Sequence, residues 1–382
     1  MLRPGIFIAF VLPLLLTACR PHDFPKFAAN YREYAYVTNG ASNTVTVLDV
    51  VNLRLDREIQ VGQHPVAVAA NPTRNQVYVV NAGPANGNGS LSVLDAEKNA
   101  IAATIPLHRQ PLSIGLDAEH QLAYVPNSGS NTVSVIDLET RREIAQIGVG
   151  EEPVEARVAP DAKTIVVPNR RSNSVSLIDA KNRRVRAFFS GCPGAADAVI
   201  LPDSSKAFVA CSAGHQVMAI TLADSKFNPG GPDRVESLMD VGRGPVQLAL
   251  KPDGGELFVM NSLSNTISEV VTTFNDVGGA YLMGNYPVHG IVSSDNSLLY
   301  VANLHSQEVT IYSIDDGKRT GSIYGGDGPC DMAFAVEGHL LFVVDSRSGD
   351  VAAVRTSTHS LFTMLPAGRE PNAIAIKAFR VR

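Results

Sequence analysis

A short run that starts with proline in seven of its eight copies recurs along the chain, and its third residue is polar in six copies. Three of these polar residues are carboxylates and one is a histidine. Together they could bind a cation, or act as acid and base on a small substrate. The alternative is that they line a hydrated channel without binding a ligand. The six candidate ligand-binding residues are Ser113, Glu155, Asp197, Gln247, His289 and Asp331.

The segments that lead into these runs contribute three further candidate ligand-binding residues, His64, Arg109 and Arg243. Acidic residues such as Glu152 occupy the same segments, so the mixed charge does not indicate attraction of a strongly charged ligand. The chain contains no CxxCH, CxxC, HExxH or GxSxG motif and no phosphate-binding loop. We therefore predict no catalytic residue, no metal site and no cofactor from motifs.

The runs belong to a longer unit that repeats eight times at a spacing near 42 residues. Within the unit apolar and polar residues alternate with period two, as in Thr44-Val-Thr-Val-Leu-Asp49, which is typical of β-strands and not of helices. Turn-forming residues divide each unit into four short strands. The clearest copies begin with Tyr36-Val-Thr-Asn39, Tyr124-Val-Pro-Asn127 and Val166-Val-Pro-Asn169, and weaker copies begin at Tyr78, Phe208, Phe258, Tyr300 and Phe342.

Four short antiparallel strands at this period describe one blade of a β-propeller. The pattern therefore predicts an all-β chain with a single propeller over residues 31–382. Eight blades are expected, with seven as the alternative. The chain enters at a second strand and leaves after an inner strand, so residues 372–376 should pair beside Tyr36–Asn39 and close the ring. The small-residue, proline-led runs suit the crowded innermost strands, so one register of polar residues should face the axis near one mouth of a channel.

These repeats resemble those of the YVTN-repeat β-propellers, a family of bacterial and archaeal surface and periplasmic proteins. The resemblance covers about residues 31–377 and rests on the Tyr-Val-x-Asn strands quoted above. It implies a propeller fold and an exported protein. It carries over no catalytic residue and no ligand.

Asparagine ends the second strand in six copies, where we expect its side chain to cap the following turn. Cys211 and Asp345 replace it in the other two copies. Cys192 precedes the inner strand next to Cys211, so an exported chain could form a Cys192–Cys211 disulfide, leaving Cys330 unpaired. The alternative is that all three cysteines are small buried apolar side chains.

The first residues carry an export signal. A cationic start and a short apolar run lead to Leu16-Thr17-Ala18-Cys19, which resembles the lipobox of bacterial lipoproteins. This predicts a signal peptide over residues 1–18, lipidation of Cys19 and a spacer over residues 19–30. The alternative is an ordinary secretory signal. Since Arg20 and not aspartate follows the cysteine, the outer membrane is favoured, with the protein facing the periplasm or the cell surface.

The net charge of −5 and the absence of tryptophan argue against binding to nucleic acid. The leading hypothesis is a non-enzymatic, membrane-tethered binding or scaffold module of the bacterial envelope. It would be a monomer, attached to the membrane by its lipid anchor only, with an envelope protein, wall polymer or small ligand bound at the loop face and channel mouth. The alternatives, by fold analogy alone, are a lactonase-like hydrolase and a haem d1-type cofactor-binding propeller.

Overall fold

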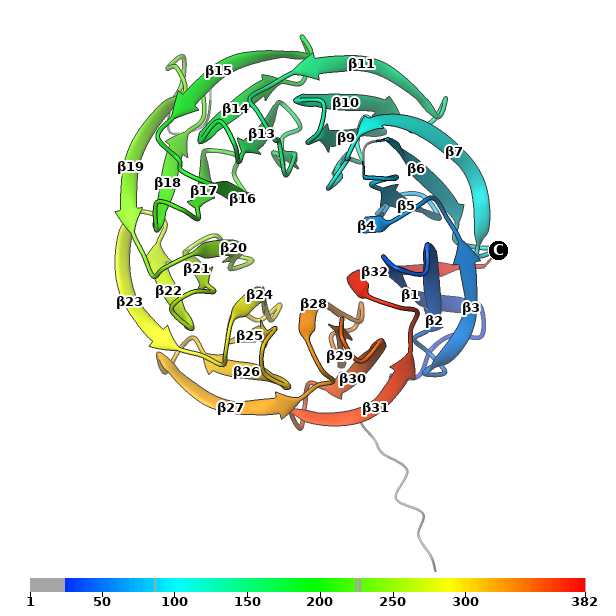
Figure 1. Cartoon of the computed structure of the whole chain (residues 1–382). Helices are drawn as coiled ribbons and strands as arrows, with labels where there is room; N and C mark the ends of the chain where they lie inside the picture. Colours follow the sequence, from blue (N-terminus) through cyan, green and yellow to red (C-terminus); the bar gives the residue numbers. More distant parts are fainter. Residues whose placement is uncertain (1–24, 86, 224, 226–227, 382) are drawn as a thin grey trace, which may run out of the picture.

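Eight four-stranded antiparallel sheets form a ring in the computed structural model, which describes residues 25–381 except 86, 224 and 226–227 (Figure 1). Every regular element in these residues is a strand, and none of the described residues forms a helix that could cross a membrane. The predicted signal peptide and Cys19 lie outside the described residues. The expected count of eight blades is confirmed, and the seven-blade alternative is wrong.

Within each blade the strands follow one another from the axis outward. Blade 1 contains β4 (Pro65–Ala70), β5 (Gln76–Asn81), β6 (Asn88–Asp95) and β7 (Ala100–Arg109). Blade 2 contains β8 (Gly115–Asp117), β9 (Leu122–Asn127), β10 (Thr132–Asp137) and β11 (Arg142–Gly148). Blade 3 contains β12 (Arg157–Val158), β13 (Thr164–Asn169), β14 (Ser174–Asp179) and β15 (Arg184–Ser190). Blade 4 contains β16 (Ala195–Ile200), β17 (Lys206–Cys211), β18 (Gln216–Thr221) and β19 (Arg234–Asp240).

The second half of the ring follows the same order. Blade 5 contains β20 (Pro245–Leu250), β21 (Glu256–Asn261), β22 (Thr266–Val271) and β23 (Asp276–Leu282). Blade 6 contains β24 (Pro287–Val292), β25 (Leu298–Asn303), β26 (Glu308–Ser313) and β27 (Lys318–Tyr324). Blade 7 contains β28 (Pro329–Phe334), β29 (Leu340–Asp345), β30 (Asp350–Arg355) and β31 (Ser360–Pro366). Blade 8 contains β32 (Pro371–Arg380), β1 (Tyr31–Asn39), β2 (Thr44–Asp49) and β3 (Arg54–Gln60).

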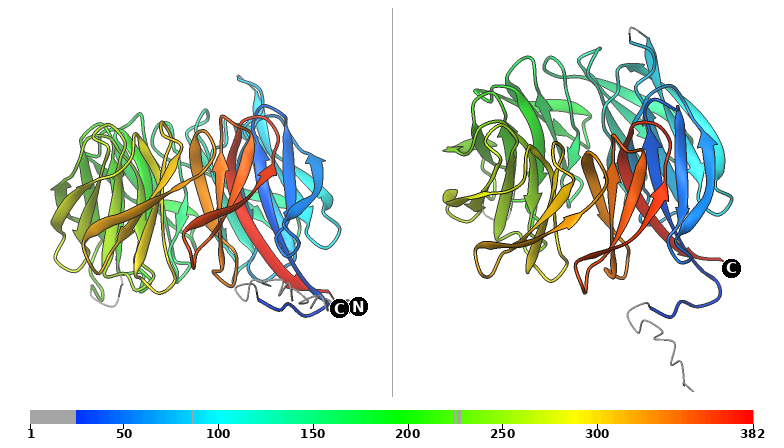
Figure 2. Two further views of the ribbon diagram at one scale, coloured as in Figure 1. Left: turned by 90° about the horizontal axis from the view of Figure 1, so that it is seen from below. Right: turned by 60° about the horizontal axis from the view of Figure 1, so that its bottom comes forward.

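The last strand of the chain completes the blade that the first strand begins. β32 pairs antiparallel with β1 over its whole length, from Tyr31 opposite Arg380 to Thr38 opposite Ala373. This is the predicted closure: the last strand of the chain forms the innermost strand of blade 8 and pairs with the first strand. Both ends of the described chain lie at one face of the ring, which we call the termini face (Figure 2). The loops that lead into the inner strands lie at the other face, which we call the mouth face.

The inner strands of blades 2 and 3 are shorter than the sequence predicts. Pro111 and Pro153, where these strands were expected to start, form only isolated bridges to Asn127 and Asn169. The strands proper begin at Gly115 and Arg157. The two segments approach so closely that a Cβ atom at Gly115 would overlap the carbonyl oxygen of Ala156. Ser113 and Glu155 therefore lie just before their strands, although each still occupies the third position of its inner run.

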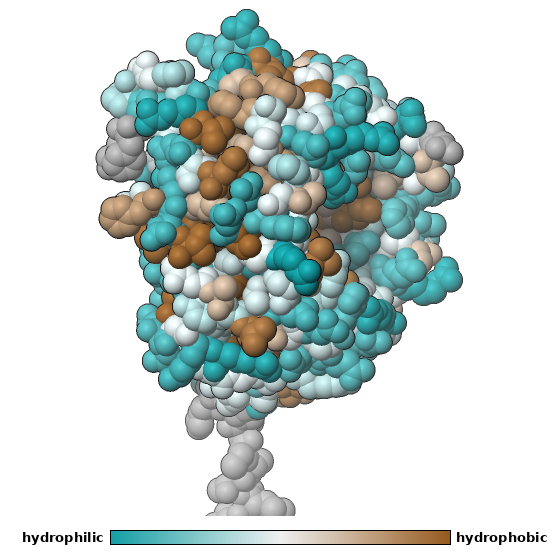
Figure 3. Space-filling model, turned by 60° about the vertical axis from the view of Figure 1, so that its left-hand side comes forward, coloured by the Kyte–Doolittle hydropathy of each residue, from teal (hydrophilic) through white to brown (hydrophobic). Residues whose placement is uncertain are grey.

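The core lies between neighbouring blades. The residue that opens the repeat is buried in all eight copies, because it faces the adjacent sheet; it is Val166 in blade 3 and an aromatic residue, at most 1% exposed, in the other seven: Tyr36, Tyr78, Tyr124, Phe208, Phe258, Tyr300 and Phe342. The outer strands are open sheet edges, and they expose apolar side chains among polar ones (Figure 3). Phe188, Leu238 and Leu282 on β15, β19 and β23 are 54%, 44% and 73% exposed.

The repeated asparagine joins two neighbouring strands in the six blades that contain it, and does not act as the turn cap that we predicted. Asn169, for example, is fully buried, and its amide donates hydrogen bonds to the hydroxyls of Ser174 and Ser176 on the next strand. Gly150 lets the incoming chain pass, because a Cβ atom there would lie 2.7 Å from Cγ of Asn169. In blade 4 a disulfide between Cys192 and Cys211 occupies this position, with a Cα–Cα distance of 4.7 Å. In blade 7 Asp345 stands there, fully buried.

Candidate functional site

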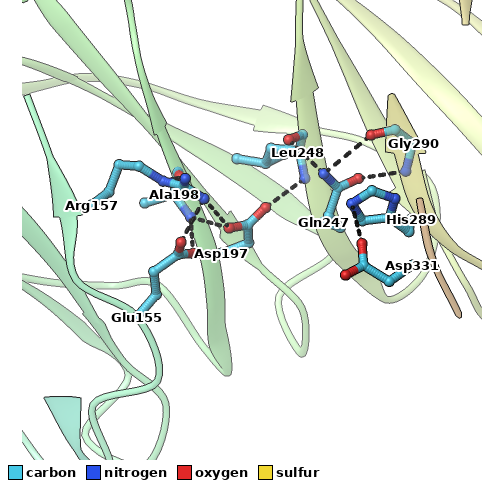
Figure 4. A network of polar contacts seen from close by, with 9 residues as sticks. All are labelled: Glu155, Arg157, Asp197, Ala198, Gln247, Leu248, His289, Gly290 and Asp331. Carbon is cyan, nitrogen blue, oxygen red and sulfur yellow. Dashed lines mark hydrogen bonds and ion pairs between the residues drawn. The ribbon is translucent and has the colours of Figure 1, made fainter. Parts of the chain in front are cut away.

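The six polar residues selected from the sequence do not converge on one point. Five of them, Glu155, Asp197, Gln247, His289 and Asp331, follow one another from blade to blade, and most of these bind the neighbouring blade (Figure 4). The repeated partner is the backbone N–H of the next inner strand, at the residue after the equivalent position. Such N–H groups face the axis without a strand partner, so a side-chain acceptor satisfies them.

Four of these cross-blade hydrogen bonds follow the same pattern. Ala198 N donates to Oε2 of Glu155 at 3.4 Å, and Leu248 N donates to Oδ2 of Asp197 at 2.7 Å. Gly290 N donates to Oε1 of Gln247 at 2.9 Å, and Ile374 N donates to Oδ2 of Asp331 at 2.9 Å. The four acceptors therefore contribute to holding blade 3 to 4, blade 4 to 5, blade 5 to 6 and blade 7 to 8 in register.

Blades 3 and 4 are further joined by an arginine that the sequence analysis missed. Nη2 of Arg157 lies 2.5 Å from Oε1 of Glu155 and 3.5 Å from Oδ1 of Asp197, while Nε donates to the carbonyl oxygen of Ala198 at 2.8 Å. One guanidinium thus lies between two carboxylates that are 19% and 10% exposed, and its single positive charge is shared between them. The signal was present in the sequence, because the equivalent position in the other seven runs holds Ala, Gly, Val or Ile.

On the other side of the ring, His289 contacts Asp331 instead of a backbone group. Nε2 of His289 lies 3.2 Å from Oδ1 of Asp331, and the two side chains are 23% and 21% exposed. Nδ1 of His289 is buried and has no hydrogen-bond partner in the described structure. Asp331 thus joins blade 6 to blade 7 through His289 and blade 7 to blade 8 through Ile374.

Burial changes the proton affinity of two of these carboxyls. It raises the pKa of Glu155 well above its usual range; Arg157 opposes the rise, and the charge of Asp197 adds to it. It also raises the pKa of Asp331, against the opposing effects of His289 and of the N–H groups of Ile374 and Met332. Carboxyls of this kind could exchange protons, but Glu155 and Asp331 sit in different parts of the ring with their oxygens already engaged.

The remaining candidates lie apart from the cross-blade contacts. The Ser113 hydroxyl is buried without a partner among the described residues. The backbone N–H of His64 donates to the Asn43 amide oxygen, and that of Arg109 donates to the Ser130 hydroxyl, so both residues belong to loops fixed at the mouth face. The Arg243 guanidinium donates to the carbonyl oxygen of Leu263 at 3.3 Å. Within the described residues no group of three His, Cys, Asp or Glu side chains could hold a metal ion.

A cavity of about 720 Å³ opens at the mouth face, and we call it the mouth cavity. It extends over blades 8, 1, 2 and 3, next to the inner-strand positions Ala67 and Ser113. The imidazole of His64 and the ion pair of Arg170 with Glu152, whose nitrogen and oxygen atoms are 3.1 Å apart, form part of its wall. Small and apolar residues form the rest of the wall, together with amides: Gly40, Ala41, Val66, Ala82, Gly83, Pro84, Ala85, Leu112, Asn43, Gln63, Gln110 and Ser128.

A larger cavity of about 890 Å³ lies on the termini face between blades 2 and 3. Four of its five acidic residues are engaged in their own turns: Asp117 binds His120, Asp137 accepts the N–H groups of residues 139 and 140, Asp161 accepts the N–H of Lys163, and Asp179 binds Asn182. These contacts account for the carboxylates as turn caps. The mouth cavity is therefore the better candidate for a binding site.

The fold and this arrangement define the class of protein: an eight-bladed β-propeller with an internally bonded axis and a cavity at one mouth. No protein-family model matches the sequence, and no curated protein matches it significantly.

Many solved structures resemble the fold. A structure of dihydro-haem d1 dehydrogenase NirN in complex with DHE is 13% identical, covering 92% of this chain and 76% of that chain, with a TM-score of 0.72. AztD of Citrobacter koseri is 12% identical, covering 92% and 99%, with a TM-score of 0.69. A candidate 6-phosphogluconolactonase of Bacteroides uniformis is 14% identical, covering 91% and 100%, with a TM-score of 0.62. At these identities the likeness establishes the propeller fold alone.

Proposed function

We propose that this chain is a non-enzymatic binding module of the bacterial envelope, exported by residues 1–18, anchored through a lipid on Cys19, and resembling the YVTN-repeat proteins in both repeat and location. The mouth cavity is the ligand or partner site. The observation that carries this proposal is the contrast between that open cavity and the occupied carboxylates of the axis. Groups that already accept backbone hydrogen bonds and ion pairs are poorly placed to serve as acid and base.

The cavity suits a small polar ligand or a side chain of a partner. Its volume lies within the range of ligand pockets, and its walls combine apolar residues with a few polar groups that could orient a ligand. His64 and the Arg170–Glu152 pair supply an imidazole and both signs of charge at the mouth. This favours a neutral or zwitterionic partner over a strongly charged one.

A matched pair of substitutions tests the site. Ala41 lines the cavity two residues after β1 ends, and Ala213 occupies the equivalent position after β17, away from the cavity. A ligand would be sought by thermal shift against envelope metabolites and wall fragments, and a partner by capture from envelope extract. Ala41→Trp should abolish the binding detected, whereas Ala213→Trp should preserve it. Equal binding by both variants would show that the mouth cavity is not the site.

The hydrolase alternative has its own test, motivated by the raised pKa of Glu155 and the unpartnered Nδ1 of His289. Turnover of a lactone and ester panel that falls in Glu155→Gln and His289→Ala would replace the binding proposal with an enzymatic one. The haem d1-type alternative is tested by adding haem and recording the Soret band, with His64→Ala as the control. Our proposal expects no turnover and no shift of that band.

A further inference from the structure

The termini face carries an exposed apolar patch beside the start of the described chain. Val336, Phe362 and Val381 are 60%, 40% and 38% exposed, and they come from three different segments of blades 7 and 8. Phe27 lines the same groove as Phe362, and its ring lies near that of His339, three residues after Val336. We call these four residues, with the exposed basic residues Lys26, Arg32 and Arg380, the termini patch.

Contacts with the N-terminal segment hold the patch together. The ring of Phe27 stacks on Tyr31 with centroids 4.7 Å apart and lies 5.9 Å from the ring of His339. Val336 N donates to Oε1 of Glu33 at 2.7 Å, and Val381 N donates to the carbonyl oxygen of Asn30 at 2.8 Å. The apolar residues are therefore fixed on one surface and are not the ends of independent loops.

A groove of about 710 Å³ runs along this surface. It lies between Phe362 of blade 7 and Leu53 of blade 8, and Phe27 forms part of its wall. The remaining lining residues are Pro25, Val51, Asn52 and Thr363. Because most of its lining residues are apolar, this groove could receive an apolar chain.

The charge of the patch is basic. None of Lys26, Arg32 and Arg380 forms an ion pair with another described residue, and all three are exposed. Glu33 is fully buried and is already bound by Tyr31 and Val336, so it does not compete at the surface. Glu337 is the acidic side chain beside Val336. Exposed apolar residues flanked by cations outside ion pairs are the composition that binds at the interface of an anionic bilayer.

The length of the spacer sets how far this surface can be from a membrane. Five residues lie between Cys19 and Pro25, so the two are six residue steps apart along the chain. Since an extended chain spans about 3.3–3.6 Å per residue, Pro25 lies within about 20 Å of the lipid attachment point. A tether this short keeps the termini patch close to the headgroups and makes its encounter with them effectively intramolecular.

We infer that the termini patch is a membrane-docking surface for anionic lipid headgroups and the adjoining acyl region, and that it holds the propeller with the mouth cavity turned away from the bilayer. The inference rests on the proposed lipid anchor. It adds a defined orientation: the mouth face is at the opposite end of the strands from the patch (Figure 2). The exposed outer-strand residues Phe188, Leu238 and Leu282 lie on β15, β19 and β23 of blades 3, 4 and 5, away from the N-terminal segment.

The absence of tryptophan from the sequence allows a direct test. Single-tryptophan variants Phe362→Trp and Val336→Trp report from the patch, and Leu263→Trp reports from the loop after β21 on the mouth face, where Leu263 is 56% exposed. The full lipidated proteins are reconstituted into phosphatidylethanolamine–phosphatidylglycerol vesicles with and without brominated acyl chains. We expect blue-shifted emission and quenching of about twofold for both patch variants, and no quenching for Leu263→Trp.

Charge reversal separates docking from the tether. Arg32→Glu combined with Arg380→Glu should reduce the quenching measured in the Phe362→Trp variant severalfold, and so should replacing phosphatidylglycerol by neutral lipid. Arg171→Glu in the loop after β13, on the mouth face, is the matched control and should have no effect. Mass spectrometry of the N-terminal peptide reports acylation of Cys19 independently. An unacylated chain would refute the anchor, whereas an acylated chain without quenching in either patch variant would refute the docking surface alone.

Discussion

The inner ring consists of two unlike sectors. In blades 3 to 7 the third residue of the inner run is Glu155, Asp197, Gln247, His289 or Asp331, a set that we call the polar sector, and four of these side chains accept a backbone N–H of the next blade. In blades 8, 1 and 2 the same position holds Ala373, Ala67 or Ser113, which we call the small-residue sector, and the mouth cavity opens beside it.

The comparison shows that polar residues at repeated positions need not mark a site. In the polar sector the side chains complete the backbone hydrogen bonding of the inner strands. Space for a ligand arises where these side chains are absent. The polar side chains of the inner strands and the cavity that could hold a ligand therefore lie in different parts of the ring.

The largest effect is expected from removing an acceptor of the polar sector. Asp197→Ala leaves the N–H of Leu248 without its acceptor and Arg157 with one carboxylate fewer, in surroundings where Asp197 is 10% exposed. Loss of a buried charged acceptor predicts a decrease of about 3 kcal/mol in the free energy of unfolding, measured by urea titration. Ala373→Ser, at the equivalent position of the small-residue sector, is the control and should change it by less than about 0.5 kcal/mol. Similar costs for both would abolish the distinction between the sectors.

The second effect concerns a carboxyl in blade 7 that has taken the place of an amide. Burial raises the pKa of Asp345 to about 7, and the nearby Asp350 adds to the rise. A pKa that is higher in the folded state than in the unfolded state means that folding binds a proton. Its contribution is therefore present at acidic pH and is lost as the pH rises from about 4 through 7.

Asp345→Asn restores the residue found in six other blades and removes this loss. We expect the variant to be about 2 kcal/mol more stable than the parent at pH 8 and similar to it at pH 4, from urea titrations at both values. Its amide can donate toward Asp350, as Asn169 donates toward Ser174. A gain that is independent of pH would mean that the charge of Asp345 is not its cause.

The third effect would come from building a cross-blade acceptor into the small-residue sector. Asp331 of blade 7 accepts the N–H of Ile374 on the inner strand of blade 8. Ala373 of blade 8 occupies the same position relative to Val68 on the inner strand of blade 1, so the carboxylate of Ala373→Asp should accept the N–H of Val68. A new charge-assisted hydrogen bond at a partly exposed site predicts a gain of about 1 kcal/mol in the free energy of unfolding. Ala373→Leu fills the same space without an acceptor and serves as the control. If both variants lose stability, packing and not hydrogen bonding sets the residue in this sector.

The sequence predicted the architecture because the same pattern of four short strands and their turns recurs in every blade. Period-two strands, turn residues and a Pro-led inner run recur eight times, and an offset of one strand between the two chain ends required the closure by β32. Because the pattern occurs eight times, departures from it in a single copy do not hide the repeat. The axis position of Glu155 and Asp331 could also be predicted from register.

The partners of these residues could not be predicted, since they depend on the spacing between blades. That Asp197 reaches Leu248 is a fact about two strands whose equivalent residues are 50 positions apart in the sequence. Arg157 was missed because the candidates on the inner runs were taken from the third position, and Arg157 is the fifth residue of its run. A binding site at the channel mouth and the candidate His64 were predicted, but the remaining lining of the mouth cavity was not, because most of it consists of small, apolar and amide side chains that form no recognisable motif.

The smallest effect tests the one polar residue that the small-residue sector contains. The Ser113 hydroxyl is buried without a hydrogen-bond partner among the described residues, so the folded state loses its hydration and gains no bond in return. Ser113→Ala should therefore raise the free energy of unfolding by about 0.5 kcal/mol, measured by urea titration at pH 7, and should leave ligand binding at the mouth cavity unchanged. Ser130→Ala is the matched control, because its hydroxyl accepts the N–H of Arg109, and it should lower stability by about 1 kcal/mol. A loss in Ser113→Ala comparable to that in Ser130→Ala would mean that Ser113 binds a group at the axis, and the polar sector would then extend into blade 2.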